Sequence, residues 1–186
     1  PVGPAAREHA RQLLRELGLE GKPLAVLGPG AIYGPAKRWE GARFAELGRR
    51  LAARGFAVAV CGTQAERETC AAVASHIASR APSGTAANLA GVTTLETLSG
   101  VCVLASLAVC NDSGLAHLSA AVGTFTVAIF GSTSSAWTAP IGERVRIVQH
   151  APVCSPCFQR SCSIGTPCLD AISVEQVEAA CLAGAA

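Results

Sequence analysis

The sequence predicts an α/β fold, a Rossmann-like parallel sheet with helices on both faces. Short apolar runs without polar interruptions alternate with amphipathic helical patterns, which is typical of a parallel sheet covered on both sides. Half of the 186 residues are hydrophobic and 15% are charged, so a chain of this length can bury a core of its own. Small or polar residues follow the apolar runs, where such folds place their ligand sites. We therefore expect a single domain over residues 1–186.

The first half of the chain indicates helices and strands in strict alternation. Apolar residues at every third or fourth position predict helices, and Gly18 and Gly55 mark the ends of two of them. Unbroken apolar runs predict buried strands. In order, we expect a leading linker helix within residues 1–20, a strand over 24–27, a helix around 44–51, a strand over 56–61 and a helix over 65–79.

The second half continues the alternation after a loop at Pro82-Ser83-Gly84. The thirty residues from Ser113 to Gly142 carry no charge, but Ser, Thr, Gly and Pro interrupt them more often than a membrane span of about 20 apolar residues allows, so we expect buried core. In order, we expect a helix from 95, a strand over 107–110, a helix over 115–122, strands over 126–130 and 145–148, and a terminal helix over 173–186.

Charge and composition exclude several classes of partner. The chain has 15 basic and 13 acidic residues and few aromatic ones, which argues against nucleic acid as a partner. Charged residues interrupt the first twenty positions, so we expect no secretory signal there. We expect a cytoplasmic location, at most peripheral to the inner membrane. Methionine is absent, which fits a piece of a longer polypeptide.

The segment Asn111-Asp-Ser-Gly-Leu-Ala-His117 is the sharpest local signal for a binding site. Ser113 suits the N-cap of a helix, and Gly114 lets a ligand approach the free backbone amides, which together form an anion site. His117 lies one turn further along and could face the same anion. The alternative is that Asp112 and Ser113 only cap the helix while His117 is a core histidine. Only two aspartates occur in the chain, so an Asp-x-Asp metal clamp is excluded.

A glycine-rich loop with a cation follows the first expected strand, over Gly30 to Trp39. Lys37 could neutralise a diphosphate as a point charge, although the Gly-Lys-Ser/Thr ending of a Walker loop is missing. The alternative is a solvated turn in which Trp39 anchors the packing. Glu66 is the type of acid that binds a ribose hydroxyl, or else an ordinary glutamate in the first turn of a helix.

Nine cysteines fall into two main groups. The first sits among Ala, Val and Leu and is expected to behave as small buried hydrophobes, namely Cys61, Cys70, Cys102 and Cys110. The second lies in a Cys-rich segment over 151–170 and comprises Cys154, Cys157, Cys162 and Cys168. Four thiols at this density permit a structural zinc site, although the spacing is not the paired form of a zinc ribbon. Reduced thiols and disulfides are the alternatives, and a reducing cytosol disfavours disulfides.

Four segments together resemble the lipopolysaccharide heptosyltransferases of glycosyltransferase family 9, in that family's order and spacing over about residues 5–180. They are Pro29-Gly-Ala-Ile-Tyr-Gly-Pro-Ala-Lys-Arg-Trp39, Asn88-Leu-Ala-Gly-Val-Thr-Thr-Leu95, Asn111-Asp-Ser-Gly-Leu-Ala-His117 and Phe130-Gly-Ser-Thr133. The sequence departs from the family pattern at Ser132, where proline is frequent, and at Leu115-Ala116, where Pro-Met is frequent. Both departures are local.

The resemblance implies the C-terminal, donor-binding half of a GT-B fold, in which two Rossmann-like halves face each other across a cleft. It implies metal-independent, inverting transfer of heptose from ADP-heptose to the lipopolysaccharide inner core, with no required cofactor. The carboxylate general base would belong to the N-terminal acceptor domain, which this chain lacks, so we expect the chain alone to be inactive.

The resemblance also implies a role for each matching residue. Lys37 and Asp112 are the expected catalytic positions, with Lys37 on the diphosphate and sugar and Asp112 on the heptose hydroxyls. The other expected substrate contacts are Glu66 on the ribose, Thr93 near the adenine, and Ser113, Gly114 and His117 at the phosphates. Two alternatives remain: another nucleotide-sugar enzyme of GT-B shape, such as a hexose transferase, and a non-enzymatic zinc or thiol module built on the four-cysteine segment.

Overall fold

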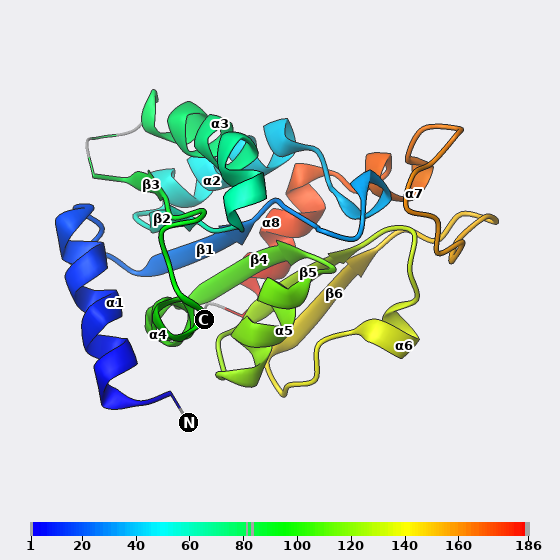
Figure 1. Ribbon diagram of the computed structural model, residues 1–186. Coiled ribbons are helices and arrows are strands. Elements are labelled where there is room, and N and C mark those ends of the chain that lie inside the picture. Colours follow the sequence, from blue (N-terminus) through cyan, green and yellow to red (C-terminus); the bar gives the residue numbers. More distant parts are fainter. Residues whose placement is uncertain (1, 81, 83, 185–186) are drawn as a thin grey trace.

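A six-stranded, all-parallel sheet forms the centre of the protein (Figure 1). The computed structural model describes residues 2–80, 82 and 84–184. The strand order is β3-β2-β1-β4-β5-β6, the order of a doubly wound nucleotide-binding fold. The strands are β1 (Leu24–Gly28), β2 (Ala57–Val60), β3 (Ala86–Asn88), β4 (Leu107–Asn111), β5 (Thr126–Phe130) and β6 (Val145–Gln149). The predicted Rossmann-like α/β class is confirmed.

Helices connect the strands and cover the sheet. The α-helices are α1 (Pro4–Glu16), α2 (Gly41–Ala53), α3 (Arg67–Ala78), α4 (Leu95–Leu104), α5 (Gly114–Ala121), α6 (Ser135–Thr138), α7 (Pro167–Asp170) and α8 (Val174–Leu182). Two 3-10 turns, η1 (Pro35–Lys37) and η2 (Gln64–Glu66), follow β1 and β2. Local capping fixes some starts: the Thr94 side chain accepts the Thr97 amide at the start of α4, and Ser173 and Gln176 form a capping box at the start of α8.

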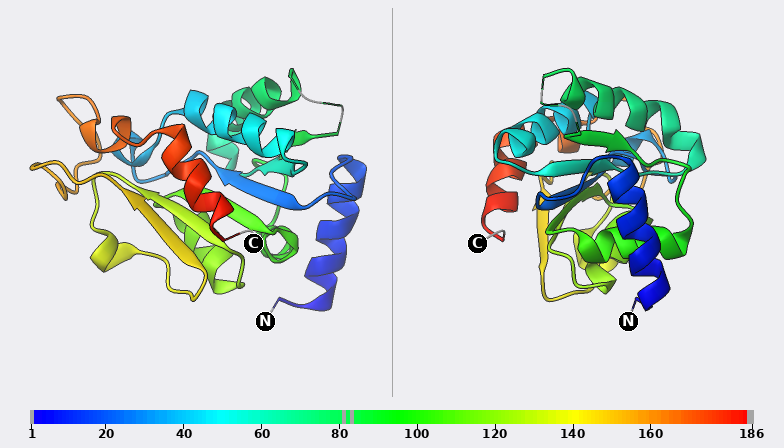
Figure 2. Two further views of the ribbon diagram at one scale, coloured as in Figure 1. Left: turned by 180° about the vertical axis from the view of Figure 1, so that it is seen from behind. Right: turned by 90° about the vertical axis from the view of Figure 1, so that its left-hand side faces the viewer.

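Side chains alternate between two hydrophobic clusters, one on each face of the sheet. Within β1, Ala25 and Leu27 join the cluster beneath α2, α3 and α8, while Leu24 and Val26 join the cluster beneath α1, α4 and α5. Figure 2 shows α8 and α5 on opposite sides of the sheet. Because both faces are covered, the central strands are apolar throughout, and this continuity is what the sequence pattern detected.

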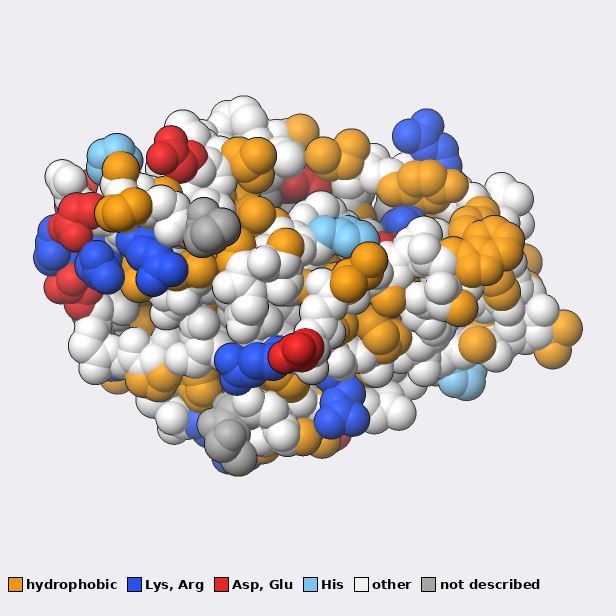
Figure 3. Space-filling view, turned by 90° about the horizontal axis from the view of Figure 1, so that it is seen from below, with side chains coloured by type: hydrophobic (Ala, Val, Ile, Leu, Met, Phe, Trp, Pro, Cys, Tyr) orange, Lys and Arg blue, Asp and Glu red, His pale blue; other side chains and the backbone are white. Residues whose placement is uncertain are grey.

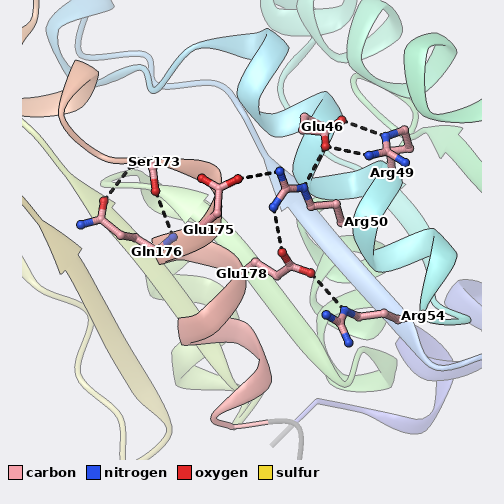
Figure 4. A network of polar contacts seen from close by, with 8 residues as sticks. All are labelled: Glu46, Arg49, Arg50, Arg54, Ser173, Glu175, Gln176 and Glu178. Atoms are coloured by element: carbon pink, nitrogen blue, oxygen red, sulfur yellow. Dashed lines mark hydrogen bonds and ion pairs between the residues drawn. The ribbon is translucent and has the colours of Figure 1, made fainter.

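A network of charged side chains holds α8 against α2 (Figure 4). Arg50 is its centre and donates to Glu46 at 2.8 Å, to Glu175 at 2.6 Å and to Glu178 at 3.0 Å. Arg54 adds a second bond to Glu178 at 3.0 Å. The bonds to Glu175 and Glu178 connect residues more than 120 positions apart, so they fix the final helix to the second one.

Every expected helix and strand is present, but the pattern did not reveal the shortest elements. β3 has only three residues, Ala-Ala-Asn, which carry no strand signal of their own, and α6 and α7 span four residues each. Ser83 of the expected loop and residues 185–186 of the expected terminal helix lie outside the described residues. The expected core over 113–142 is confirmed for the strand Thr126–Phe130, which is buried throughout, and is wrong where His117, Trp137 and Ile141 are exposed. In the described part of the chain, no helix has the length and apolarity to cross a membrane.

Candidate functional site

One pocket opens at the carboxyl ends of β1, β2 and β4, with a volume of about 850 Å³. Its lining comes from the loops after these strands and after β3, from the starts of α4 and α5, and from Thr138 of α6. All seven residues expected to contact a substrate line it: Lys37, Glu66, Thr93, Asp112, Ser113, Gly114 and His117. These residues are separated by up to 80 positions in sequence, and the parallel topology brings them together at one edge of the sheet.

A buried ion pair between Lys37 and Asp112 lies in the wall of this pocket. The Lys37 ammonium approaches Asp112 Oδ2 at 2.5 Å, and the two side chains are 11% and 3% exposed. Thr133 Oγ1 donates to the same oxygen at 2.5 Å. The alternative of a solvated turn around Lys37 is therefore wrong, because two neighbouring loops hold this cation in a defined position.

The side chain of Asn111, at the end of β4, connects the glycine-rich loop to the sheet. Its Nδ2 donates to the carbonyl of Pro29 at 2.8 Å, and its Oδ1 accepts the Trp39 amide at 3.0 Å. Trp39 is buried, packs edge-on against Phe44, and donates its ring N–H to the Ile172 carbonyl. Trp39 is thus a packing anchor, as the alternative reading of this loop proposed, while Lys37 two positions earlier faces the pocket.

The start of α5 presents backbone amides to the pocket. Ser113 occupies the N-cap position with an extended backbone, but its side chain makes no capping hydrogen bond. The first turn of a helix leaves its amides without partners inside the helix, and the helix dipole adds partial positive charge there. His117 is exposed and lines the pocket, so its reading as a core histidine is wrong. Three sources of positive or donor character therefore surround one space.

Glu66 lies at the end of η2, where it caps the turn and also lines the pocket. Its carboxylate accepts the backbone amide of Thr63 at 2.8 Å and the Thr63 hydroxyl at 2.9 Å, which is a capping role. It also lines the pocket and packs so closely against Gly30 that a Cβ there would collide with it. Thr93 lies on the same side, near the apolar side chains of Leu95 and Leu98, which suit a flat ring.

The cysteines in the described part of the chain are not arranged as a metal centre. All nine are free thiols, and the expected group of buried ones is confirmed. Within residues 2–80, 82 and 84–184, no cluster of three or more His, Cys, Asp or Glu side chains is placed to hold a metal. Structural zinc at Cys154, Cys157, Cys162 and Cys168 is therefore not supported. The physical reason is their different burial, since Cys168 is packed inside while Cys154 faces solvent.

Burial also makes the internal thiols poor nucleophiles. Desolvation raises the pKa of Cys70 to about 12 and raises the pKa of Cys61, which lines the pocket, well above its ordinary value. A thiol attacks as the thiolate, so burial makes Cys61 a poor nucleophile although this residue lines the pocket.

Besides Asn111, whose bonds were not predicted, the sequence-based expectations also missed Thr133, Tyr33 and Gln64. Thr133 lies in a segment that was noticed for its position after a strand, but its bond to Asp112 depends on tertiary contact. Tyr33 lies within the glycine-rich loop, and its ring is 4.8 Å from the Lys37 ammonium. Gln64 lines the pocket beside Glu66. In the sequence, the only signal for these residues is that each lies in the connection that follows a strand.

The sequence of residues 3–167 matches Glycosyltransferase family 9 (heptosyltransferase). The chain is 33% identical over 153 residues to lipooligosaccharide heptosyltransferase 2 of Haemophilus influenzae, covering 80% of this chain and 43% of the relative. It is 34% identical over 128 residues to lipopolysaccharide heptosyltransferase 2 of Salmonella typhimurium, covering 69% and 36%. The chain thus spans less than half the length of these curated relatives.

Solved structures show the same fold. E. coli ADP-heptose lps heptosyltransferase II superimposes with a TM-score of 0.81 at 25% identity, over 100% of this chain and 52% of that one. A structure of E. coli heptosyltransferase WaaC with ADP superimposes with a TM-score of 0.66 at 22% identity, over 91% and 47%, and shows the fold alone. The sheet order, the pocket at its carboxyl edge and the match over most of the sequence agree, and the chain belongs to glycosyltransferase family 9, the heptosyltransferases.

Proposed function

We propose that this chain is the donor-binding half of a heptosyltransferase and that its pocket binds ADP-heptose. The observation that carries the proposal is the Lys37–Asp112 pair beside the first turn of α5, inside a pocket of about 850 Å³. A nucleoside diphosphate sugar needs a cationic centre for its diphosphate and a less polar end for its base, and the pocket offers both. The names of the relatives support heptose as the sugar.

The pocket can perform the charge stabilisation that glycosyl transfer requires. When the bond between the anomeric carbon and the diphosphate oxygen breaks, negative charge develops on the leaving diphosphate, and fixed positive groups lower the barrier. The Lys37 ammonium and the amides of the α5 start supply such groups, and His117 lines the same space. We propose that they meet the diphosphate charge without a divalent ion, and that Asp112 orients Lys37 and contacts the sugar hydroxyls.

The remaining parts of the reaction are assigned to protein outside these 186 residues. We propose that a carboxylate there removes the proton from the acceptor hydroxyl, which then attacks the anomeric carbon from the opposite side with inversion. The acceptor would be the lipopolysaccharide inner core. The same proposal places the protein in the cytoplasm, at most peripheral to the inner membrane, where nine free thiols suit a reducing environment.

Isothermal titration calorimetry with ADP and ADP-heptose tests the proposal. We expect both to bind, and we expect Lys37→Ala to weaken ADP binding about tenfold to a hundredfold, the range for losing hydrogen bonds from a charged donor. Lys22→Ala is the matched control, because Lys22 is the other of the two lysines in the sequence and is exposed outside the pocket. The proposal is rejected if the folded chain binds neither ligand.

Competition then identifies the sugar. ADP-heptose should displace a fluorescent ADP analogue at lower concentration than ADP-hexoses or UDP-sugars do. Stronger displacement by a hexose donor would instead favour a hexose transferase of the same fold. The chain alone should transfer no sugar, so turnover by the purified 186 residues would contradict the assignment of the base to another part of the protein.

A further inference from the structure

The segment between β6 and α7, which carries three of the clustered cysteines, packs against the glycine-rich loop after β1. Arg160 Nε donates to the Tyr33 carbonyl at 2.9 Å, and the Arg160 carbonyl accepts the Ala36 amide at 3.1 Å. The Tyr33 hydroxyl donates to the Phe158 carbonyl at 2.6 Å. A Cβ on Gly34 would collide with the Arg160 carbonyl, so the two backbones are in close contact.

The same segment is attached to the end of β5. The amides of Cys157 and Phe158 donate to the Ser132 carbonyl at 3.0 and 2.8 Å, and Ser155 Oγ donates to the Gly131 carbonyl at 3.1 Å. The segment therefore bridges two loops at the edge of the sheet that carries the pocket. Both ends of this bridge adjoin groups that hold the ion pair, since Thr133 follows β5 and Lys37 follows β1.

The ring of Tyr33 is the point at which the segment reaches Lys37. The Arg160 guanidinium lies 5.4 Å from the ring centre and the Lys37 ammonium 4.8 Å from it. Each cation is attracted to the electron-rich ring, and the Tyr33 hydroxyl bond limits rotation of the ring. Tyr33 lines the pocket, whereas Arg160 does not.

The surface differs between the two ends of the molecule. Figure 3 shows hydrophobic side chains collected at the end away from α1, while charged ones gather at the opposite end over α1.

We propose that Arg160 is a positioning residue that sets the Lys37 ammonium through Tyr33, and that the segment over 151–165 acts as a brace for the donor-binding loop. Lys37 has Asp112 on one side and the Tyr33 ring on the other, so movement of the ring changes the space in which the ammonium sits. The consequence for donor binding rests on the proposed function, whereas the placement of Lys37 does not.

NMR without any ligand tests the placement of Lys37. The sequence has only two lysines, so protein labelled with ¹³C at the lysine ε carbon gives two assignable signals, and the Lys37 methylene is sensitive to the ring of Tyr33. We expect Arg160→Ala and Tyr33→Phe to shift the Lys37 signal and to leave the Lys22 signal in place. Arg144→Ala is the matched control, because Arg144 lies over the Phe125 ring at 6.0 Å and far from the pocket. An unmoved Lys37 signal in folded Arg160→Ala protein overturns the inference.

A double-mutant cycle with ADP tests the path through Lys37. We expect Arg160→Ala to weaken ADP binding about fivefold in the native background, within the range for one lost hydrogen bond, and by less than about twofold when Lys37→Ala is already present. Arg160→Lys, which keeps a cation over the ring, should recover most of the loss. An equal loss in both backgrounds would mean that Arg160 does not act through Lys37 and would overturn the inference.

The NMR experiment and the double-mutant cycle can fail independently of each other. If the native chain does not bind ADP, the proposed function is refuted, and the NMR result alone decides the role of Arg160. If Arg160→Ala does not fold, Tyr33→Phe still reports on the ring through the Lys37 signal, because it removes the hydroxyl bond to Phe158. A Lys37 signal that folded Tyr33→Phe protein also leaves in place would overturn the inference.

Discussion

Two systems of ion pairs stabilise different parts of this protein, and they differ in burial and in purpose. In the pocket, one pair joins Lys37 to Asp112, whose side chains are 11% and 3% exposed. On the outside, six charged residues form a network on the second helix and the last one: Glu46, Arg49, Arg50, Arg54, Glu175 and Glu178. In the outer network Arg50 is 27% exposed and Arg54 50%.

The comparison teaches why a charge is buried at all. An exposed pair is screened by water and contributes little, whereas a buried pair costs desolvation that an apolar pair of similar size would avoid. Selection for stability alone would therefore not place the Lys37–Asp112 ion pair in a buried position. Its position is explained if a ligand later takes up the ammonium, because the carboxylate holds the ammonium in a fixed position until then. The outer network needs no such explanation, because fixing α8 against α2 is sufficient.

The largest expected effect comes from breaking the buried pair. Asp112→Ala leaves the Lys37 ammonium without its counter-ion in a nearly closed space and removes the acceptor of Thr133. We expect the free energy of unfolding to fall by about 3 kcal/mol, as is typical when one partner of a buried pair is removed. Urea denaturation followed by circular dichroism measures it.

A double variant separates the cost of the lone charge from the value of the pair. Lys37→Met with Asp112→Leu removes both charges and should recover stability to within about 1 kcal/mol of the native protein, while ADP binding should stay as weak as in Lys37→Ala. If the double variant is as unstable as Asp112→Ala, the pair is needed for folding and our account of why it is buried is wrong.

The fold was predictable because its signals are local. Each central strand carries its own apolar run, as Thr126–Phe130 does, and each long helix carries its own periodicity. β3 was missed because three small residues form a strand only by pairing with Val58–Val60 of β2. Trp137 and Ile141 were assigned to the core because a stretch without charge does not distinguish a buried segment from an exposed apolar one.

The site was predictable only where one short segment carries its own chemistry. Lys37, Asp112 and His117 lie within three positions of a glycine in recognisable short motifs, and all of them line the pocket. Asn111 and Thr133 could not be assigned, because their partners lie 72 and 21 positions away and only the fold makes them neighbours. Arg160 is the extreme case, since nothing in the Cys-rich segment suggests a contact with Tyr33, 127 positions earlier.

A smaller effect is expected from the outer network. Arg50→Ala removes the bonds to Glu46, Glu175 and Glu178, and partly exposed pairs of this kind contribute up to about 1 kcal/mol each. We expect a Tm about 2–4 °C lower, the shift that 1 kcal/mol produces in a chain of this size, and an unchanged affinity for ADP. The Tm difference from the native protein should shrink in 1 M NaCl, since salt screens exposed charges.

Arg15→Ala serves as the matched control for that measurement. Arg15 lies on α1 with Glu8 at 3.5 Å and is about half exposed, so its loss should change Tm by less than the loss of Arg50 does. A Tm for Arg50→Ala equal to that of the native protein would show that the bonds of Arg50 do not stabilise the packing of α8, whose apolar face buries Val177 and Cys181.

The smallest effect is a dependence of stability on pH that comes from Glu46. Hydrogen bonds from Arg49 and then from Arg50 lower the pKa of Glu46 from 4.5 to about 2. Because the folded pKa is the lower one, the contribution of Glu46 is complete above pH 4.5 and is lost as the pH falls from 4.5 toward 2. Glu46→Gln removes this titration. The Tm of the native protein minus that of Glu46→Gln should therefore be constant from pH 7 to 5 and should fall between pH 4.5 and 2. A constant difference through that lower range would mean that Arg49 and Arg50 do not bind the Glu46 carboxylate when the protein is in solution. The outer network would then be less ordered than the exposed fractions of its side chains suggest.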